Sequence, residues 1–174
     1  QPDPVVMIAG GPGQSALEGY PTVSGAFGEI LRHRDVILVD QRGTGGSNLL
    51  ACPELTDEEA PTVAADPAAT AALVRRCLAG LQADPRFYTT TEAIADFEAV
   101  RTALGVSQWN LAGISYGTRV ALEYLRRHPQ AIRSVVLDGV VPPELVLGAD
   151  HARNLEQSLD AQFARCGAEP ACAA

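Results

Sequence analysis

A serine stands at the junction between two different hydrophobic patterns. The segment Gly-Ile-Ser-Tyr-Gly at 113–117 follows an apolar run, 109–112, that is typical of a buried strand, and a helical pattern continues to residue 127. A strand that turns directly into a helix needs small residues two positions either side of the serine, because larger side chains would clash. The turn exposes the hydroxyl, and the helix N-terminus adds partial positive charge beside it. We predict that Ser115 is a catalytic nucleophile; the alternative is a structural glycine-rich turn.

The rest of the chain alternates between short apolar segments and helical patterns. The strand-like segments are 5–9, 35–39, 109–112 and 134–137, and the helical patterns cover 69–81, 89–104, 116–127 and 150–165. Each strand-like segment is apolar almost throughout, as expected of parallel strands that are covered on both faces. A capping box of Thr89 and Glu92 marks the start of one helix, and Gly105 marks its end. The alternation predicts an α/β fold with a parallel sheet core, flanking helices and right-handed crossovers.

Four cysteines fall as two sequence-local pairs, Cys52 with Cys77 and Cys166 with Cys172. Neither pair has the C-x-x-C spacing or the companion histidines of a zinc site, so we expect no metal. Disulfides within each pair are the simplest of the three possible connectivities and imply an oxidising, extracytoplasmic compartment. The alternative is four buried free thiols. The first bridge would tie down the stretch 49–86, which is rich in proline and which we expect to cross the surface.

Charge and hydropathy exclude several classes of function. The chain has 174 residues, with 13 basic residues, all of them arginine, and 21 acidic ones, for a net charge of -8. This balance disfavours binding to nucleic acid or to anionic membrane surfaces. No apolar run approaches the roughly 18 residues of a membrane-spanning helix. The N-terminus carries no basic region followed by an apolar stretch, so we expect that any export signal was removed or was never present.

A second glycine-rich segment, Gly-Gly-Pro-Gly-Gln-Ser at 10–15, follows the strand-like segment 5–9. Such a loop leaves backbone N–H groups free, and the tetrahedral intermediate of acyl transfer needs two donors. We expect one from Tyr116, the residue after the serine, and one from Gly11. The alternative, a phosphate-binding loop, lacks the Gly-Lys-Ser/Thr sequence, and the G-x-G-x-x-G spacing of a dinucleotide fold is missing. We therefore expect no cofactor.

A third segment, Asp-Gln-Arg-Gly-Thr-Gly-Gly-Ser at 40–47, follows the strand-like segment 35–39. We expect a structural role for it, in which Asp40 and Arg42 brace one another and the neighbouring loops. Its glycines allow a tight turn, and Ser47 suits the N-cap of a helix.

These three segments, together with Asp-Gly-Val at 138–140, resemble the α/β-hydrolase fold family. Within that family they are similar to the proline iminopeptidase and tripeptidyl aminopeptidase group of secreted bacterial serine exopeptidases, and the resemblance spans nearly the whole chain. The cysteine pairs also look like those of the secreted tripeptidyl branch. Ala9 stands where many proline iminopeptidases carry histidine, which favours the same branch.

The resemblance implies a serine hydrolase of which this chain is the N-terminal part. In the family a serine attacks the substrate carbonyl, a histidine transfers the proton, and an aspartate orients the histidine. Similarity assigns Ser115 as the nucleophile and places the histidine and the acid later than this chain extends. It also assigns 1–149 to a partial hydrolase core and 150–174 to the beginning of a helical cap. The substrates would be peptides or small esters and amides, and the remaining C-terminal part of the hydrolase is expected as a partner.

The histidines of this chain are poor candidates for the base. His33 precedes a strand, His128 ends a helix at the opposite sheet edge from the serine, and His151 opens the cap helix. Asp138 ends the strand after the nucleophile helix; we expect it to shape a loop, with contact to a catalytic histidine as the alternative. We therefore predict that the chain alone is inactive. The rival functions are a carboxylesterase on the same fold and an inert hydrolase-like binding module.

Overall fold

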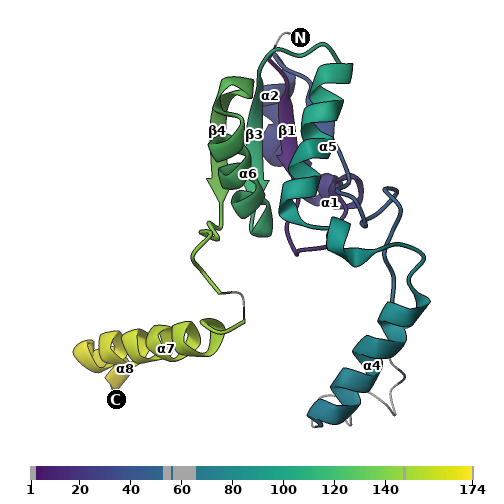
Figure 1. Ribbon diagram of the computed structural model, residues 1–174. Coiled ribbons are helices and arrows are strands. Elements are labelled where there is room, and N and C mark those ends of the chain that lie inside the picture. Colours follow the sequence, from purple (N-terminus) through teal and green to yellow (C-terminus); the bar gives the residue numbers. More distant parts are fainter. Residues whose placement is uncertain (1–2, 53–55, 57–65, 147, 174) are drawn as a thin grey trace. The chain divides into compact units, whose positions relative to one another are not determined.

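The computed structural model of the protein describes residues 3–52, 56, 66–146 and 148–173 (Figure 1). The chain divides into two compact units, Gln1–Val140 and Val141–Ala174. The first unit contains a four-stranded sheet with its helices, and the second contains helices only among its described residues. The assignment of 150–174 to a cap stays a prediction.

The four strands of the sheet are all parallel, which confirms the prediction from the apolar segments. They are β1 Val5–Ile8, β2 Val36–Leu38, β3 Trp109–Ile114 and β4 Ile132–Asp138, in the spatial order β2-β1-β3-β4. The register pairs Ile8 of β1 with Gly113 of β3. It also pairs Ile114 of β3 with Asp138 of β4. The carboxyl ends of the strands therefore share one edge of the sheet, where open parallel α/β folds place their sites.

Helices α5 Thr90–Ala103 and α6 Tyr116–Arg127 cover one face of the sheet (Figure 1). Apolar side chains of both helices pack with those of β1 and β3 into the larger core cluster. The rings of Phe97, Trp109 and Tyr124 meet in this cluster at centroid separations of 6.1 to 6.5 Å. All three side chains are buried, so this face is the best-packed part of the unit.

The opposite face of the sheet packs against a helical segment whose beginning the sequence patterns did not predict. This segment comprises α1 Ala16–Val23, the 3₁₀ helix η1 Ser24–Phe27 and α2 Gly28–Leu31. Phe27 is buried in a cluster with Val5 and Met7 of β1. Pro21 lies inside α1 and obscures its helical pattern. The signal that could have revealed α1 is Ser15, which caps it by accepting a hydrogen bond from the N–H of Glu18.

On the same face of the sheet, parts of β3 and β4 are not covered by a described helix of the first unit. Val136 of β4 is 63% exposed, and the side chains of Ser134 and Asp138 are accessible beside it. A cavity of about 370 Å³ lies there, lined mainly by apolar side chains such as Phe27 and Ile114. Since parallel strands are normally covered on both faces, this region of the unit is incompletely packed.

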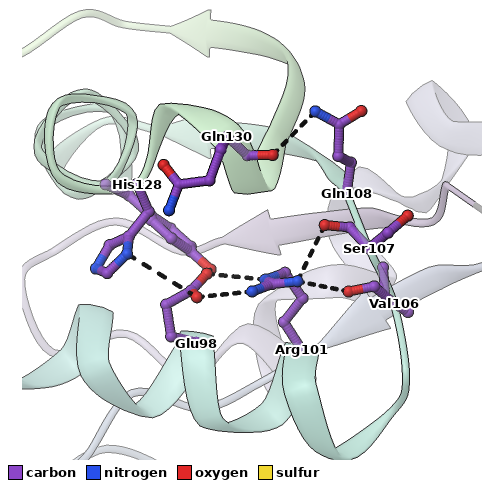
Figure 2. A network of polar contacts seen from close by, with 8 residues as sticks. Glu98, Arg101, Val106, Ser107, Gln108, His128 and Gln130 are labelled. Carbon is purple, nitrogen blue, oxygen red and sulfur yellow. Dashed lines mark hydrogen bonds and ion pairs between the residues drawn. The ribbon is translucent and has the colours of Figure 1, made fainter.

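A polar network joins the end of α5 to the end of α6 and to the turn before β3 (Figure 2). Arg101 forms a two-pronged pair with the carboxylate of Glu98 and donates to the carbonyl oxygen of Val106. Tyr124 donates its hydroxyl to Glu98, and Nδ1 of His128 lies 3.9 Å from the same carboxylate. The hydrogen bond from Arg101 holds the pKa of Glu98 below its usual value, although burial opposes this.

The remaining described helices bury few side chains. They are α4 Pro67–Gly80, η2 Pro85–Phe87, η3 Pro129–Ala131, α7 His151–Ala168 and α8 Pro170–Ala173. The structure pairs Cys52 with Cys77 and Cys166 with Cys172, the simplest of the three connectivities, which leaves no free cysteine. None of the described side chains of α4 or α7 is buried. Part of the stretch 49–86, which we expect to cross the surface, lies outside the described residues, at 53–55 and 57–65.

Candidate active site

Ser115 occupies the single-residue turn between β3 and α6. Its backbone has φ of 54° and ψ of -122°, and its side chain is exposed. A positive φ is costly for a residue with a Cβ atom, and such strain persists only where the surrounding structure enforces it. The serine of the 113–117 segment therefore projects from a strained strand-to-helix turn, as the spacing of its glycines predicts.

Three glycines allow the backbone to fold this tightly. A Cβ atom at Gly113 would lie 2.6 Å from the carbonyl oxygen of Gly117. One at Gly117 would lie 2.1 Å from the carbonyl oxygen of Ile8 in β1. One at Gly10 would lie 2.9 Å from Cβ of Ser115. Each separation is shorter than real Cβ contacts allow, so side chains at these positions would displace the turn.

Backbone hydrogen bonds fix the turn to its neighbours. The N–H of Ser115 donates to the carbonyl oxygen of Asp138 at 2.8 Å, which ties the turn to the end of β4. The hydroxyl of Thr118 donates to the carbonyl oxygen of Ser115 at 2.7 Å. Thr118 is fully buried. The Ser115 backbone is thus held from the strand side and from the first turn of α6.

The loop 10–15 lies beside the Ser115 hydroxyl. A Cβ atom at Gly10 would come within 3.5 Å of Ser115 Oγ, so the loop backbone approaches the hydroxyl closely. Gly11 and Gly13 have φ of 102° and 106°, conformations that favour glycine. Tyr116 begins α6, so its N–H has no acceptor within the helix. Both expected oxyanion donors therefore belong to backbone segments that adjoin Ser115.

Asp40 connects the loop 10–15 to the segment 40–47. Its Oδ1 accepts hydrogen bonds from Ser15 Oγ at 2.8 Å and from the N–H of Leu17 at 3.2 Å, and its Oδ2 accepts from the N–H of Gly46 at 2.9 Å. Burial by itself raises the pKa of this carboxyl, but the hydrogen bonds outweigh it, so the pKa of Asp40 lies below its usual value. The prediction that this aspartate braces neighbouring loops is confirmed.

The prediction that Asp40 and Arg42 bind one another is wrong, because the two side chains bind different partners. Arg42 forms a two-pronged pair with Asp96 of α5 and donates to the carbonyl oxygen of Phe87. The prediction for Ser47 is also wrong. Residues 48–52, which directly follow it, form no helix, and its N–H and carbonyl instead close the turn of the 40–47 segment.

A small cavity of about 180 Å³ lies between the loop 10–15 and the N-terminus of α5. Tyr88 and Tyr116 contribute its aromatic walls, and Pro12 and Gly13 line it from the loop. The hydroxyls of Tyr116 and Thr90 are hydrogen-bonded to one another. The side chain of Tyr116 is therefore fixed on α5, whereas its backbone N–H belongs to the Ser115 turn.

The structure does not bring a histidine of the first unit to Ser115. His128 caps the far end of the 12-residue helix α6, whose N-cap is Ser115, which puts the two residues about 18 Å apart along the helix axis. His33 precedes β2, at the amino edge of the sheet. His151 belongs to the second unit. Asp138 is among the residues that line the cavity on the open face of the sheet, and its backbone carbonyl holds the Ser115 turn.

The described residues also contain neither a metal site nor a membrane-spanning helix. Among the described residues, no group of three or more histidine, cysteine, aspartate or glutamate side chains is arranged to hold a metal ion. In the same part of the chain, no helix has the length and apolarity that crossing a bilayer requires.

Comparison with known proteins identifies the family. The family profile for the alpha/beta hydrolase fold matches residues 3–168. Proline iminopeptidase of Neisseria gonorrhoeae is 29% identical over 138 residues, which cover 79% of this chain and 32% of that protein. Serine protease Hip1 of Mycobacterium tuberculosis is 30% identical over 154 residues, which cover 80% of this chain and 29% of Hip1.

A solved structure agrees with these relatives. The crystal structure of a proline iminopeptidase-related protein from Thermus thermophilus has a TM-score of 0.51 and 28% identity, covering 79% of this chain and 36% of that chain. The chain thus spans 29% to 36% of the length of these proteins. The parallel sheet, the strained serine turn and these matches together show that the chain belongs to the α/β-hydrolase fold family.

Proposed function

We propose that this chain is the nucleophile-bearing part of a serine hydrolase that cleaves amide bonds at peptide N-termini, as a tripeptidyl or prolyl aminopeptidase does. The observation that carries the proposal is the exposed Ser115 hydroxyl at a positive-φ turn, beside the loop of Gly11 and the N-terminus of α6. A hydroxyl in this setting can attack a carbonyl carbon, because it is exposed and lies beside backbone N–H groups that can stabilise the oxyanion. The relatives named proline iminopeptidase and serine protease Hip1 support an amide substrate.

The proposed reaction proceeds through an acyl-enzyme. Ser115 Oγ attacks the carbonyl carbon while a histidine removes its proton. The N–H groups of Gly11 and Tyr116 donate to the oxyanion of the tetrahedral intermediate. When the intermediate collapses, the C–N bond breaks and the histidine gives its proton to the leaving amine. Water then hydrolyses the ester on Ser115, releases the acid product and restores the hydroxyl.

We assign the histidine and the acid of this mechanism to polypeptide outside this chain. Among the described residues of the first unit, no histidine lies near Ser115. Asp138 is the alternative acid within the chain, because its strand ends beside the nucleophile turn. We place the beginning of a cap at 150–174. The chain alone is inactive, since an unassisted serine hydroxyl is a weak nucleophile.

The setting of the enzyme follows from its disulfides and its charge. Two disulfides favour an oxidising, extracytoplasmic compartment. A net charge of -8 disfavours nucleic acid as a partner. We propose a peptide or a small amide or ester as the substrate. A carboxylesterase is the second candidate, because the same hydroxyl and donors serve esters, and an inert binding module is the third.

The test uses the complete product of the reading frame that encodes this chain, called the full polypeptide below. We expect a fluorophosphonate to label it at Ser115, and we expect hydrolysis of prolyl or tripeptidyl arylamides. Ser115→Ala should abolish labelling and lower kcat by about four orders of magnitude or more. Ser107→Ala is the matched control, because Ser107 is exposed and lies before β3. This variant should leave fluorophosphonate labelling and kcat unchanged.

The outcomes separate the three candidates. Cleavage of short acyl esters without any arylamide turnover identifies the carboxylesterase. A folded full polypeptide that no fluorophosphonate labels identifies the binding module and overturns the proposal. Asp138→Asn should keep most of kcat, and a loss comparable to that of Ser115→Ala would instead make Asp138 the catalytic acid. Turnover by residues 1–174 alone would contradict the predicted inactivity of the chain.

A further inference from the structure

We propose that Asp40 is a positioning residue, which holds the loop 10–15 so that the N–H of Gly11 points to the oxyanion. This role rests on the proposed function, because it acts on a donor of that reaction. The role goes beyond holding loops together, because the carboxylate binds Ser15, the last residue of the loop 10–15 that carries Gly11. Three features of the structure carry the inference.

The first feature is where the carboxylate is attached. Asp40 is 7% exposed, and its Oδ1 accepts hydrogen bonds from Ser15 Oγ and from the N–H of Leu17. Ser15 is itself buried and is the N-cap of α1. Asp40 therefore fixes the point at which the loop becomes a helix, and the partial positive charge of that helix end favours the carboxylate.

The second feature is that the loop has few other restraints. Residues 11–14 are exposed. Within the loop the N–H of Gln14 donates to the carbonyl oxygen of Gly10 at 3.4 Å, which is a long hydrogen bond. Gly11 and Gly13 have positive φ and no side chain that could pack against a neighbour. The loop is thus held at one end by β1 and at the other by the bond between Ser15 and Asp40.

The third feature is the fit of the carboxylate. A Cβ atom at Gly45 would lie 2.1 Å from Asp40 Oδ2 and 2.8 Å from Ser15 Oγ. The N–H of Gly46 donates to the same Oδ2 at 2.9 Å. The glycine at 45 therefore allows the backbone to enclose the carboxylate. No room remains for a longer acidic side chain at position 40.

These contacts predict that an amide will not replace the carboxylate. Donors converge on both oxygens of Asp40, whereas asparagine offers one oxygen and a donating NH₂ group. In either orientation of its amide, Asp40→Asn must therefore set the NH₂ group against the N–H of Gly46 or of Leu17, and this disturbs the contacts that end the loop. An oxyanion donor works only within about 0.5 Å of its productive position. Since the oxyanion exists only after attack, the loss should fall on kcat rather than on KM.

The experiment measures kcat per active site in the full polypeptide, with active sites counted by fluorophosphonate titration. We expect Asp40→Asn to lower kcat by about 10- to 100-fold, less than the loss of a whole oxyanion donor, and to change KM by less than about 2-fold. Asp96→Asn is the matched control, because it removes the carboxylate that anchors Arg42 in the same segment. It should change kcat per site by less than about 2-fold.

A second variant and a second measurement protect the result against misfolding. Ser15→Ala should lower kcat per site as Asp40→Asn does, and the double variant should add little further loss. Hydrogen exchange of the loop 10–15 should accelerate in Asp40→Asn but not in Asp96→Asn. Unchanged kcat per site in Asp40→Asn, or an equal loss in Asp96→Asn, overturns the positioning role alone. A wild-type protein that is folded but unlabelled overturns the proposed function, and this role with it.

Discussion

Gly117, in the first turn of α6, lies against the carbonyl oxygen of Ile8 in β1 so closely that a Cβ atom would be 2.1 Å from it. Gly117→Ala must therefore push α6 away from the sheet or twist the Ser115 turn. We expect the variant to lower the free energy of unfolding by about 3 kcal/mol, measured by urea denaturation of the full polypeptide. Fluorophosphonate labelling of Ser115 should slow in the fraction that remains folded.

Gly28 provides the matched control for this prediction. It begins α2 with ordinary helical φ and ψ, and an added Cβ atom would meet nothing within 4 Å. Gly28→Ala should leave the protein as stable as before, or about 0.5 kcal/mol more stable, because alanine restricts the unfolded chain. Equal losses in the two variants would show that the close approach to Ile8 is not what Gly117 provides.

Arg42 and Asp96 form the second relationship that can be tested. Nε and Nη2 of Arg42 donate to the two carboxylate oxygens of Asp96, each at 2.6 Å, and Nη1 reaches the carbonyl oxygen of Phe87. Lysine cannot reproduce this fork. Arg42→Lys should therefore lower the free energy of unfolding by about 1 kcal/mol, a modest value because Asp96 is partly exposed. The measurement is thermal denaturation of the full polypeptide.

The control is Arg86→Lys, which alters a similar pair in a more exposed place. The side chain of Arg86 is 84% exposed and pairs with Asp84, two residues away. The change should be neutral within about 0.5 kcal/mol. A double-mutant cycle between Arg42 and Asp96 that gives no coupling would contradict a stabilising role for this pair, which joins the 40–47 segment to α5.

Local signals explain which elements the sequence predicted correctly. The apolar segments indicated the four strands because burial on both faces removes alternation from parallel strands. Thr89 caps α5 by accepting from the N–H of Glu92, and Gly105 follows that helix with φ of 67°. Each of these features depends on residues close in sequence. The same holds for the Ser115 turn, whose small neighbours lie two positions away.

The error about Asp40 and Arg42 concerns contacts between residues distant in sequence. Asp40 and Arg42 are two positions apart, which suggested that they pair. Oδ1 of Asp40 instead binds Ser15, 25 positions earlier, and Arg42 binds Asp96, 54 positions later. The order of the strands in the sheet decides which partners a side chain contacts. The residues next to Asp40 and Arg42 in the sequence do not reveal that order. For α1, Pro21 hid a helix that tertiary packing forms nonetheless.

Glu123 should make stability depend on pH in the acid range. Hydrogen bonds from Arg126 and then Arg127 lower its pKa from 4.5 to about 2. A carboxyl whose pKa is lowered by folding adds stability above its unfolded pKa and loses it as pH falls to the folded value. Glu123→Gln should therefore destabilise the full polypeptide at about pH 6, and the difference should shrink between pH 4.5 and about pH 2. Urea unfolding at several pH values measures it.

Glu29→Gln is the control for the pH dependence, because the side chain of Glu29 is 82% exposed. Its effect should be small at every pH. A difference between wild type and Glu123→Gln that stays constant from about pH 6 to about pH 2 would mean that lost packing, and not charge, is responsible.

The disulfide between Cys52 and Cys77 should protect α4 rather than the sheet. Helix α4 has 14 residues and no buried side chain, and Val74 and Leu78 are more than half exposed. A helix of this length is marginal without packing, so its order depends on the cross-link. In the full polypeptide, the Cys52→Ser/Cys77→Ser variant should be cut by trypsin after Arg75 and Arg76 at least about 10-fold faster, whereas hydrogen exchange at 109–114 stays unchanged.

The second disulfide supplies the control, since Cys166 and Cys172 lie in the other unit. Removing it with Cys166→Ser/Cys172→Ser should leave cleavage after Arg75 and Arg76 at the wild-type rate. Mass spectrometry of the early fragments gives the sites and rates of cleavage. Wild-type cleavage rates in the Cys52→Ser/Cys77→Ser variant would show that contacts other than the disulfide hold α4. Faster exchange at 109–114 in the same variant would instead show that the cross-link stabilises the sheet, since those amides exchange only when β3 opens.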